Sequence, residues 1–569
     1  MDTPHPTADP LSEGREACSR GLWNGLLLAL VIAAGFFGVY LVNLGRQELI
    51  NASEDVVIQP AMEARQGGPW WIPNMNGRPR ILKPPLPTWI AAAAMSRETI
   101  VATRNGEMAD REAAFRTLAF QARWPSALAA ALIVVGTWWL GSIVADGTVG
   151  LAAAAMCGST VLLLRFGRMA NTDVQLTLWV VLANGCMATA LLQGRWWRGC
   201  LGAGVCLGLA LMSKGPVGLL QSVVPMAVFG VYQRLLGDEG ARRARTNLAA
   251  IGGGALVMLA IALPWPVSVL MTVPNAAHLW VQDVFAPPGT EQRVGHWWGY
   301  VNLLPNLLPW VPLFAGGLCL PFLKRFRGRR AMMAWLLFIV PVIVMSFVRD
   351  KNERYGMPMV PAAAILSGFL AVAFVRNRAE MTWSDRLAEN LQWIVGFAMA
   401  GAIVAGAMSI QGTPPFYSWT VAIVGVSAAL GTMLIALVAR RRAPWLAVAG
   451  PAAVSLIVYH IAMLGYLASP GGQSEYRPLA MRAQAEYPEA ELLFYDGGIG
   501  RHVPTDLAIY AGHIVRNVKE EALSQGSDRE QVLFAIQNAD EPVRQFDGWT
   551  FVTSEVAERR RGSLYVRKP

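Results

Sequence analysis

The sequence predicts an α-helical protein that crosses a membrane many times and ends in a small α/β domain. The 569-residue chain is 54% hydrophobic and 15% charged, whereas soluble domains usually carry about a quarter charged residues. Apolar runs of roughly twenty residues, the length that a helix needs to cross a bilayer, recur as far as about residue 468. Beyond that point the sequence is polar and lacks such runs.

The apolar runs predict about thirteen transmembrane helices. Their approximate positions are 21–44, 124–143, 148–164, 174–193, 199–213, 216–235, 247–270, 301–323, 331–348, 357–376, 391–410, 416–438 and 445–468. The first run is preceded by a polar segment and no small-residue cleavage site follows it, so we interpret it as a retained signal anchor.

Basic residues predict the orientation of the helices. Five basic segments fall on one side of the predicted membrane, at 195–198, 242–245, 324–330, 376–378 and 440–442. Because basic loops stay in the cytoplasm, this side is expected to be cytoplasmic, together with the N-terminal tail 1–20. The outer side then holds the long loop 45–123 and the segment 469–569. The net charge is +10, and the basic residues lie in short loops between helices. This placement does not indicate a nucleic-acid partner.

The outer segment 469–569 has the pattern of a small α/β domain. Short strands are expected at 491–495, 507–510, 531–536, 549–552 and 563–566, and helices near 475–488 and 515–525. The membrane domain spans 21–468 and carries most of the six cysteines. None of them has metal-type spacing such as CxxC, so a disulfide framework or zinc site is disfavoured. No cofactor is predicted with certainty, and a divalent metal is left open.

Two acids in the outer loop, Glu54 and Asp55, follow Ser53. One interpretation is structural: Ser53 caps a helix, and the two acids complement its dipole. The other is chemical, because a carboxylate near the membrane surface can take a proton from an attacking hydroxyl.

Asp173 is a third candidate, at the outer edge of a predicted span. Asn171 or Asp173 could cap the helix that begins there. An acid at that depth in a membrane protein is costly, however, and is a candidate functional residue for that reason.

Two outer segments could bind a phosphate. Lys83 precedes Pro84-Pro85 and a short interfacial helix expected at 86–94. Arg349, Lys351, Arg354 and Tyr355 form a second polar cluster. Each cation could simply reach toward lipid head groups, or it could stabilise a phosphate. The chain has no P-loop or glycine fingerprint, so a lipid-phosphate donor fits these outward-facing groups better than a nucleotide.

Five motifs in fixed order resemble the integral-membrane GT-C glycosyltransferases, over roughly residues 20–370. The nearest group is that of the lipid A aminoarabinose transferases and protein O-mannosyltransferases. The motifs are a first-loop series (SED at 53–55, GPWWIP at 68–73, NGRP at 76–79 and KPPL at 83–86), RMANTD at 168–173, SKGP at 213–216, LPW at 263–265 and YGMPMVP at 355–361.

The resemblance implies transfer of a sugar from a polyprenyl-phosphate carrier to an acceptor hydroxyl outside the cytoplasm, with inversion at the anomeric carbon. It implies that a first-loop acid is the base or the acceptor-positioning group and that Asp173 is the second acid. It also implies that Lys83 lies near the carrier phosphate and that Tyr355 contacts it, and the neighbouring Arg354 of the second polar cluster is expected to meet the same phosphate. The family's first loop usually reads Asp-Glu, and alignment on Trp70 places Ser53 at the Asp position and Glu54 in register. Glu54 is therefore favoured over Asp55 as the base.

Two other functions fit parts of the sequence. Many spans with intramembrane charges also suit a transporter or flippase of lipid-linked glycans. Ser53 at the family's Asp position would also suit a related scaffold without catalysis. The long outer loop, its Lys83-Pro84-Pro85 segment and the outer domain favour the enzyme. The sequence does not identify the sugar or whether the acceptor is a lipid, a glycan or a protein.

Overall fold

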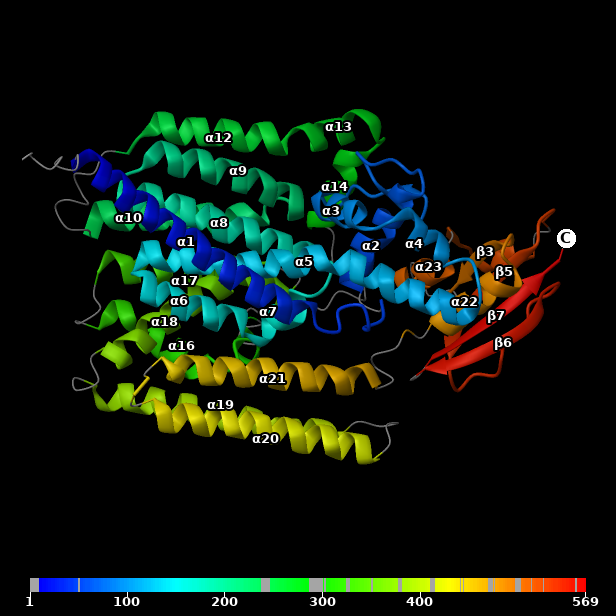
Figure 1. Ribbon diagram of the computed structural model, residues 1–569. Coiled ribbons are helices and arrows are strands. Elements are labelled where there is room, and N and C mark those ends of the chain that lie inside the picture. The colour runs from blue at the N-terminus through cyan, green and yellow to red at the C-terminus, as the bar shows by residue number, and fades with distance from the viewer. Residues whose placement is uncertain are drawn as a thin grey trace, which may run out of the picture.

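The computed structural model is a long helical bundle with a small sheet domain at one end (Figure 1). It describes residues 10–49, 52–236, 246–285, 300, 303–323, 328–348, 351–376, 381–409, 415–440, 442–443, 445–468, 474, 476–496, 503–512, 514–524, 527–557 and 560–568. The basic segment 242–245 lies wholly outside these residues, as do parts of the segments 324–330, 376–378 and 440–442, and Arg349.

Helices occupy every predicted span in the described part of the chain. In order they are α1 (Pro10–Leu41), α5 (Met108–Val144), α6 (Gly147–Gly158), α7 (Val161–Phe166), α8 (Thr172–Gln193), α9 (Trp196–Lys214), α10 (Val217–Leu236), α12 (Leu248–Ala262), α13 (Pro264–Thr272), α14 (Ala276–Phe285), α15 (Leu303–Asn306), α16 (Val311–Gly317), η2 (Leu320–Phe322), α17 (Arg329–Ser346), η3 (Glu353–Met359), α18 (Val360–Arg376), α19 (Trp383–Ser409), α20 (Pro415–Ala439) and α21 (Leu446–Ala468). Eight stretches of the described residues are long and apolar enough to cross a membrane, and three shorter apolar helices accompany them. The number thirteen therefore remains a prediction.

The predicted span 301–323 is broken into the short helices α15, α16 and η2. Four prolines, at 305, 309, 312 and 321, lie within it. Because each proline lacks an amide donor and clashes with the preceding helical turn, a continuous helix is not formed.

The long outer loop folds into a compact cap over the bundle. It contains α2 (Ala52–Arg65), β1 (Asn74–Met75), β2 (Arg78–Pro79), α3 (Leu86–Ala94) and α4 (Arg97–Ala102). Helix α3 begins directly after the double proline, as predicted. Glu63 of α2 accepts hydrogen bonds from the amides of Asn76 (2.5 Å) and Gly77 (3.1 Å) in the β1–β2 turn. Burial raises the pKa of Glu63, and these two amides partly oppose that shift.

The C-terminal domain has a five-stranded sheet in the order β4-β3-β5-β7-β6. Its strands are β3 (Glu491–Tyr495), β4 (Val515–Asn517), β5 (Gln531–Asn538), β6 (Thr550–Ala557) and β7 (Arg560–Arg567), and its helices are α22 (Arg477–Glu486), α23 (Thr505–Ala511) and α24 (Glu520–Leu523). β3 pairs in parallel with β4 and β5, whereas β7 is antiparallel to β5 and β6.

Two local predictions for this domain were wrong. Residues 507–510 form helix α23 instead of a strand, and residues 515–517 form strand β4 instead of the start of a helix. All residues from Leu507 to Ala511 are buried. Because a short, fully buried apolar run shows no alternation, its pattern does not separate a strand from a helix.

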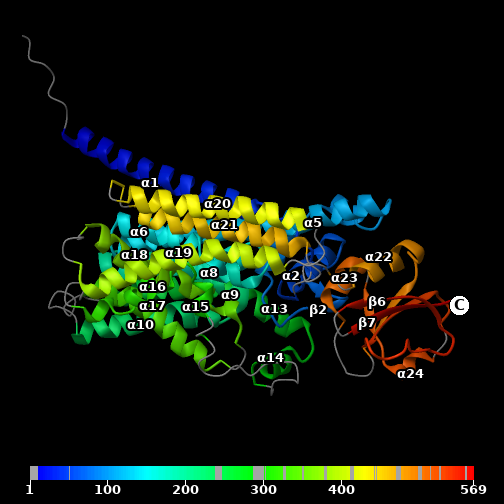
Figure 2. The same cartoon turned by 90° about the horizontal axis from the view of Figure 1, so that it is seen from below.

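The C-terminal domain packs directly on the cap formed by the outer loop (Figures 1 and 2). Asn76 exchanges two hydrogen bonds with the backbone of Val515, at 2.5 and 2.9 Å. The Tyr510 hydroxyl accepts a hydrogen bond from the Leu49 amide at 3.0 Å, just before α2. One hydrophobic cluster joins α2, α3 and α5 to α22, α23 and the sheet. The loop and the domain therefore share a single core.

Candidate active site

Asp173 lies at the beginning of α8 and is 1% exposed. The helix is capped by Asn171, whose side-chain oxygen accepts from the amides of Asp173 and Val174 at 3.0 Å each. The carboxylate of Asp173 instead forms ion pairs with Lys214 through Oδ1 and with Arg354 Nε through Oδ2, the latter at 3.3 Å. Capping and charge therefore belong to two different residues at this helix start.

Three distant segments meet at this carboxylate. Lys214 lies in the last turn of α9, and its Nζ sits 3.8 Å from the centre of the Tyr355 ring. Arg354 and Tyr355 come from η3, and the Arg354 guanidinium lies 5.7 Å from the same ring. Gln221 of α10 donates to the Tyr355 carbonyl at 3.0 Å, which fixes the backbone of η3. The aromatic face stabilises both cations beside Asp173.

Lys83 joins this group from the cap. It lies in the loop before α3, within electrostatic range of Lys214. Lys214 and Arg354 pair with Asp173, and Lys83 adds a third cation within electrostatic range of Lys214, which leaves an excess of positive charge near this carboxylate. A cluster of cations at a partly buried surface is suited to bind a phosphate.

Glu54 lies in a second, fully buried arrangement. Its two oxygens accept from Arg123 Nε and Nη2 of α5 at 2.7 Å each. Glu54 Oε1 also accepts from the amide of Ala170 at 2.8 Å. Arg123 further donates to the carbonyls of Leu44, Gln47 and Glu48. This pair ties α2 to α5 and to the segment that leads into α8.

Asp55 occupies the next position on α2 and is 1% exposed. It lies within electrostatic range of Arg123. The segment from Ala170 to Asp173 connects the two arrangements, because it bonds to Glu54 at one end and carries the carboxylate between Lys214 and Arg354 at the other. The first-loop acids and the cation cluster are thereby held in one structural unit.

Two residues of this site were not predicted from the sequence, namely Arg123 and Lys214. Both are cations next to predicted spans, and Lys214 lies within a motif quoted above, which was the available signal. The ammonium of Lys351 donates to the Val348 carbonyl at 2.8 Å. Among the described residues, no group of three or more His, Cys, Asp or Glu side chains could hold a metal ion.

Comparison with known proteins places this geometry in context. Residues 113–266, which include Arg123, Asp173 and Lys214, match the family model for dolichyl-phosphate-mannose-protein mannosyltransferase. The chain is 28% identical over 436 residues to the undecaprenyl phosphate-alpha-4-amino-4-deoxy-L-arabinose arabinosyl transferase 2 of Pseudomonas fluorescens, covering 73% of this chain and 68% of that protein. It is 27% identical to the corresponding transferase of Pseudomonas paraeruginosa, covering 68% and 66%.

The fold is shared with solved structures. ArnT from Cupriavidus metallidurans in the apo state matches with a TM-score of 0.68 at 19% identity, over 97% of this chain and 98% of that one. The form of that protein bound to undecaprenyl phosphate matches with a TM-score of 0.67 at 19% identity, over 95% and 97%. This likeness confirms the predicted GT-C fold with its C-terminal sheet domain. The apolar helices and the relatives also identify a multi-pass inner-membrane protein.

Proposed function

Because the chain belongs to the GT-C glycosyltransferases of the lipid A aminoarabinose transferase and protein O-mannosyltransferase-like group, we propose that it transfers a sugar from a polyprenyl-phosphate carrier to an acceptor hydroxyl, with inversion. The observation that carries this proposal is the pairing of Lys214 and Arg354 with Asp173, with Lys83 within electrostatic range of Lys214. The names of the relatives point to a pentose related to aminoarabinose on an undecaprenyl carrier.

The cation cluster would bind the phosphate of the carrier. In the reaction, the acceptor oxygen forms a bond to the anomeric carbon while the bond from that carbon to the phosphate oxygen breaks. Negative charge therefore develops on the departing polyprenyl phosphate. Lys83, Lys214 and Arg354 are positioned to stabilise it, and such fixed charges are commonly the largest contribution to catalysis.

Asp173 acts in this scheme as a positioning residue. One of its oxygens pairs with Lys214 and the other with Arg354. Since two like charges repel one another, a carboxylate between them keeps both near the phosphate before the donor binds. Tyr355 supports the same two cations through its ring.

We assign the role of general base to Asp55, in preference to Glu54. Glu54 is committed to Arg123 and to the amide of Ala170. A proton on Glu54 would disrupt that buried pair. Asp55 lies at the next position on the same helix. A base there would take the proton of the acceptor hydroxyl as the hydroxyl attacks.

The orientation in the membrane is part of the proposal. The N-terminal tail 1–20 would face the cytoplasm, and the domain 469–569 would lie outside it, as the basic segments indicate. The cap with Asp55 and Lys83 packs on this domain, so the reaction would take place at the outer surface. The membrane domain 21–468 would supply the catalytic groups.

Release of polyprenyl phosphate tests this function against a flippase. The purified chain in detergent is mixed with a polyprenyl-phosphate-linked aminopentose, and the lipids are measured by mass spectrometry. An enzyme releases the polyprenyl phosphate in the presence of an acceptor, and Asp55→Asn prevents this release. A flippase has no second compartment in a micelle and leaves the donor intact. An intact donor, with each acceptor class supplied in turn, would overturn the proposal.

A further inference from the structure

A pocket lies far from the candidate active site, at the opposite end of the bundle. It is formed where α18 and α20 end and α19 and α21 begin. Since α21 runs from this pocket toward the C-terminal domain, the pocket and the domain lie at opposite ends of the helices (Figure 1). The empty space in and around the pocket, counted together with the part that is open to the surroundings, is about 470 Å³.

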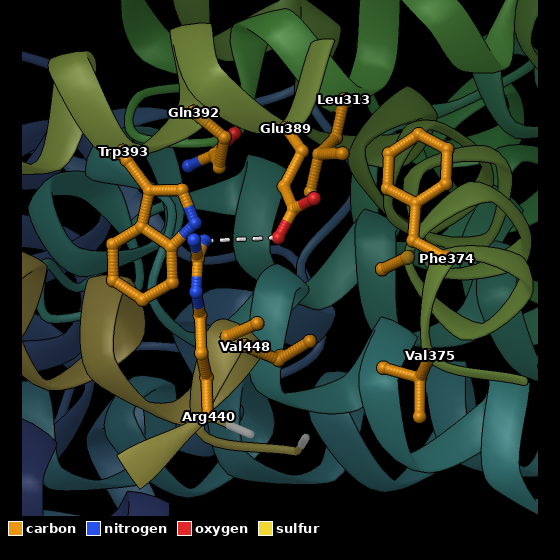
Figure 3. A pocket seen from close by; sticks show the side chains of 10 residues that line it. Leu313, Phe374, Val375, Glu389, Gln392, Trp393, Arg440 and Val448 are labelled. Atoms are coloured by element: carbon orange, nitrogen blue, oxygen red, sulfur yellow. Dashed lines mark hydrogen bonds and ion pairs between the residues drawn. The ribbon is translucent and has the colours of Figure 1, made fainter. Parts of the chain in front are cut away.

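The pocket lies between two hydrophobic clusters of the helical bundle, and α21 contributes to both of them. The main core includes Leu313, Leu370 and Phe374 from α16 and α18. A smaller core holds α19, α20 and α21 together around Trp393 and Met433. The pocket is lined from both sides, because Leu313 and Phe374 face Trp393 and Arg440 across it (Figure 3).

The lining combines an apolar wall with three polar side chains. Glu389 and Arg440 form an ion pair at 3.0 Å, drawn as the dashed line in Figure 3. The Arg440 guanidinium lies 5.1 Å from the centre of the Trp393 ring. Leu313, Phe374 and Val448 supply apolar surface. A ligand that fits must therefore be amphipathic.

Gln392 gives a second, independent indication of a ligand. Its side chain is 3% exposed, and its Nε2 donates to the Pro309 carbonyl at 2.8 Å. Its Oε1 is buried and accepts no hydrogen bond from any described residue. A buried acceptor without a donor is costly. The ligand should therefore supply a hydroxyl or amine donor here.

The surrounding charge favours an anion. Arg386 lies one helical turn before Glu389 on α19, and Arg442 follows Arg440; both are exposed. Arg440 lines the pocket with Glu389, and these two exposed arginines lie three and two residues away from that pair in the sequence. Basic pockets between transmembrane helices are suited to the head groups of anionic lipids.

We propose that this pocket binds an anionic phospholipid with a glycerol head group, of the phosphatidylglycerol class. The phosphate meets Arg440, a head-group hydroxyl donates to Gln392 Oε1, and the acyl chains follow the apolar wall of the pocket. The lipid then adds to the existing contacts between helices α19 and α21 and the main core. This site is independent of the proposed transferase reaction, because it lies at the other end of the helices.

The test measures lipid binding through thermal unfolding of the full chain. The protein is stripped of lipid in a neutral detergent, and phosphatidylglycerol, phosphatidylethanolamine or phosphatidylcholine with matched acyl chains is added. A ligand that binds only the folded state raises the unfolding midpoint in proportion to its affinity. We expect phosphatidylglycerol to raise the midpoint more than the other two lipids.

Two variants locate the effect. Arg440→Gln should weaken the apparent affinity for phosphatidylglycerol about tenfold, the factor expected for one lost charge-assisted hydrogen bond. Arg440→Lys keeps the charge and should recover part of that affinity. Arg376→Gln is the matched control: Arg376 also forms one ion pair at this end, with Asp146 at 2.8 Å, but does not line the pocket. It should bind as the unaltered protein does.

Two results would overturn the proposal. One is an equal response of the unaltered protein to all three lipids, which indicates only general lipid around the helices. The other is an equal loss in Arg376→Gln and Arg440→Gln, which indicates surface charge and no specific pocket. Gln392→Leu provides a further check, because it removes the buried acceptor and should also reduce the preference for phosphatidylglycerol over phosphatidylcholine.

Discussion

Glu54 and Arg123 form a bidentate ion pair in which both side chains are 1% exposed, at 2.7 Å for each of two contacts. The pair joins the first helix of the outer loop to the longest helix of the bundle. Arg123 also binds three carbonyls of the segment before α2. The guanidinium of Arg123 therefore donates to acceptors from several segments, and it holds these segments together next to the proposed base Asp55.

The first prediction separates structure from chemistry at the two neighbouring acids. Glu54→Gln should chiefly destabilise the protein, because removing one partner of a buried ion pair costs about 3–5 kcal/mol. Asp55→Asn should leave the thermal unfolding midpoint nearly unchanged and lower the transfer rate roughly a hundredfold or more, as expected for a lost general base. Thermal unfolding and the rate per folded molecule are measured for both variants.

The alignment of the first loop with the family on Trp70 favours the opposite result, in which Glu54 is the base. Counted from Trp70, Glu54 is the residue at the family's acid position. If Glu54→Gln folds with normal stability and loses transfer, while Asp55→Asn retains it, then the register is correct and the assignment to Asp55 is wrong.

The second prediction concerns Asp173. Asp173→Asn should nearly abolish transfer with little effect on folding, because Asn171 provides the cap of α8. Asn171→Ala is the control for capping and should cost about 1 kcal/mol of stability. Normal turnover by Asp173→Asn would show that Lys214 and Arg354 need no carboxylate between them.

The third prediction addresses the cation cluster. Lys214→Met and Lys83→Met should each weaken binding of polyprenyl phosphate by about tenfold, since each removes a charged contact. The effects should not add in the double variant, because both cations meet one phosphate. Binding is measured directly with polyprenyl phosphate, and undiminished binding by Lys214→Met would remove that residue from the site.

Local signals allowed much of the fold to be predicted. The start of α3 after Pro84-Pro85 and the position of Asp173 at the start of α8 both follow from residues that lie next to one another. The four strands at 491–495, 531–538, 550–557 and 560–567 overlap the predicted ones. The helix at 505–511 was missed because its residues are buried on all sides, and burial depends on the neighbouring α2 and sheet.

Sequence patterns did not predict the ion pairs of the site that join residues far apart in the chain. Lys214 and Asp173 are 41 residues apart, and Arg123 and Glu54 are 69 apart. No periodicity links such residues, because their contact depends on how α8 packs on α9 and how the outer loop folds back on α5. The motifs indicated the resemblance to a family. Neither the motifs nor the resemblance indicated that Glu54 pairs with Arg123.

The fourth prediction concerns orientation. The predicted odd number of spans, together with the cytoplasmic N-terminus that the basic segments predict, would place the C-terminal domain outside the cytoplasm. A reporter that is active only outside the cytoplasm, fused after Lys568, should be active. A reporter that requires the cytoplasm, fused at the same position, is the matched control and should be silent. The reverse result at normal expression would move Asp55 and Asp173 to the cytoplasmic side.

The last prediction gives the C-terminal domain a positioning role toward α2. Arg477 of α22 forms ion pairs with Glu48, just before α2, and with Glu112 of α5 at 3.2 Å. Arg477→Leu should therefore loosen the segment that precedes Asp55. We expect a lower kcat for transfer with little change in the binding of polyprenyl phosphate, because the cation cluster is not disturbed.

Arg544→Leu is the matched control for this prediction. Arg544 pairs with Glu520 inside the C-terminal domain, and its side chain is 44% exposed. Exposed pairs contribute roughly 0–1 kcal/mol, so this variant should transfer at the normal rate. If both variants lose kcat equally, the effect belongs to the stability of the domain. If only Arg477→Leu loses it, the contact with Glu48 carries the domain's influence to α2, and through α2 to the proposed base.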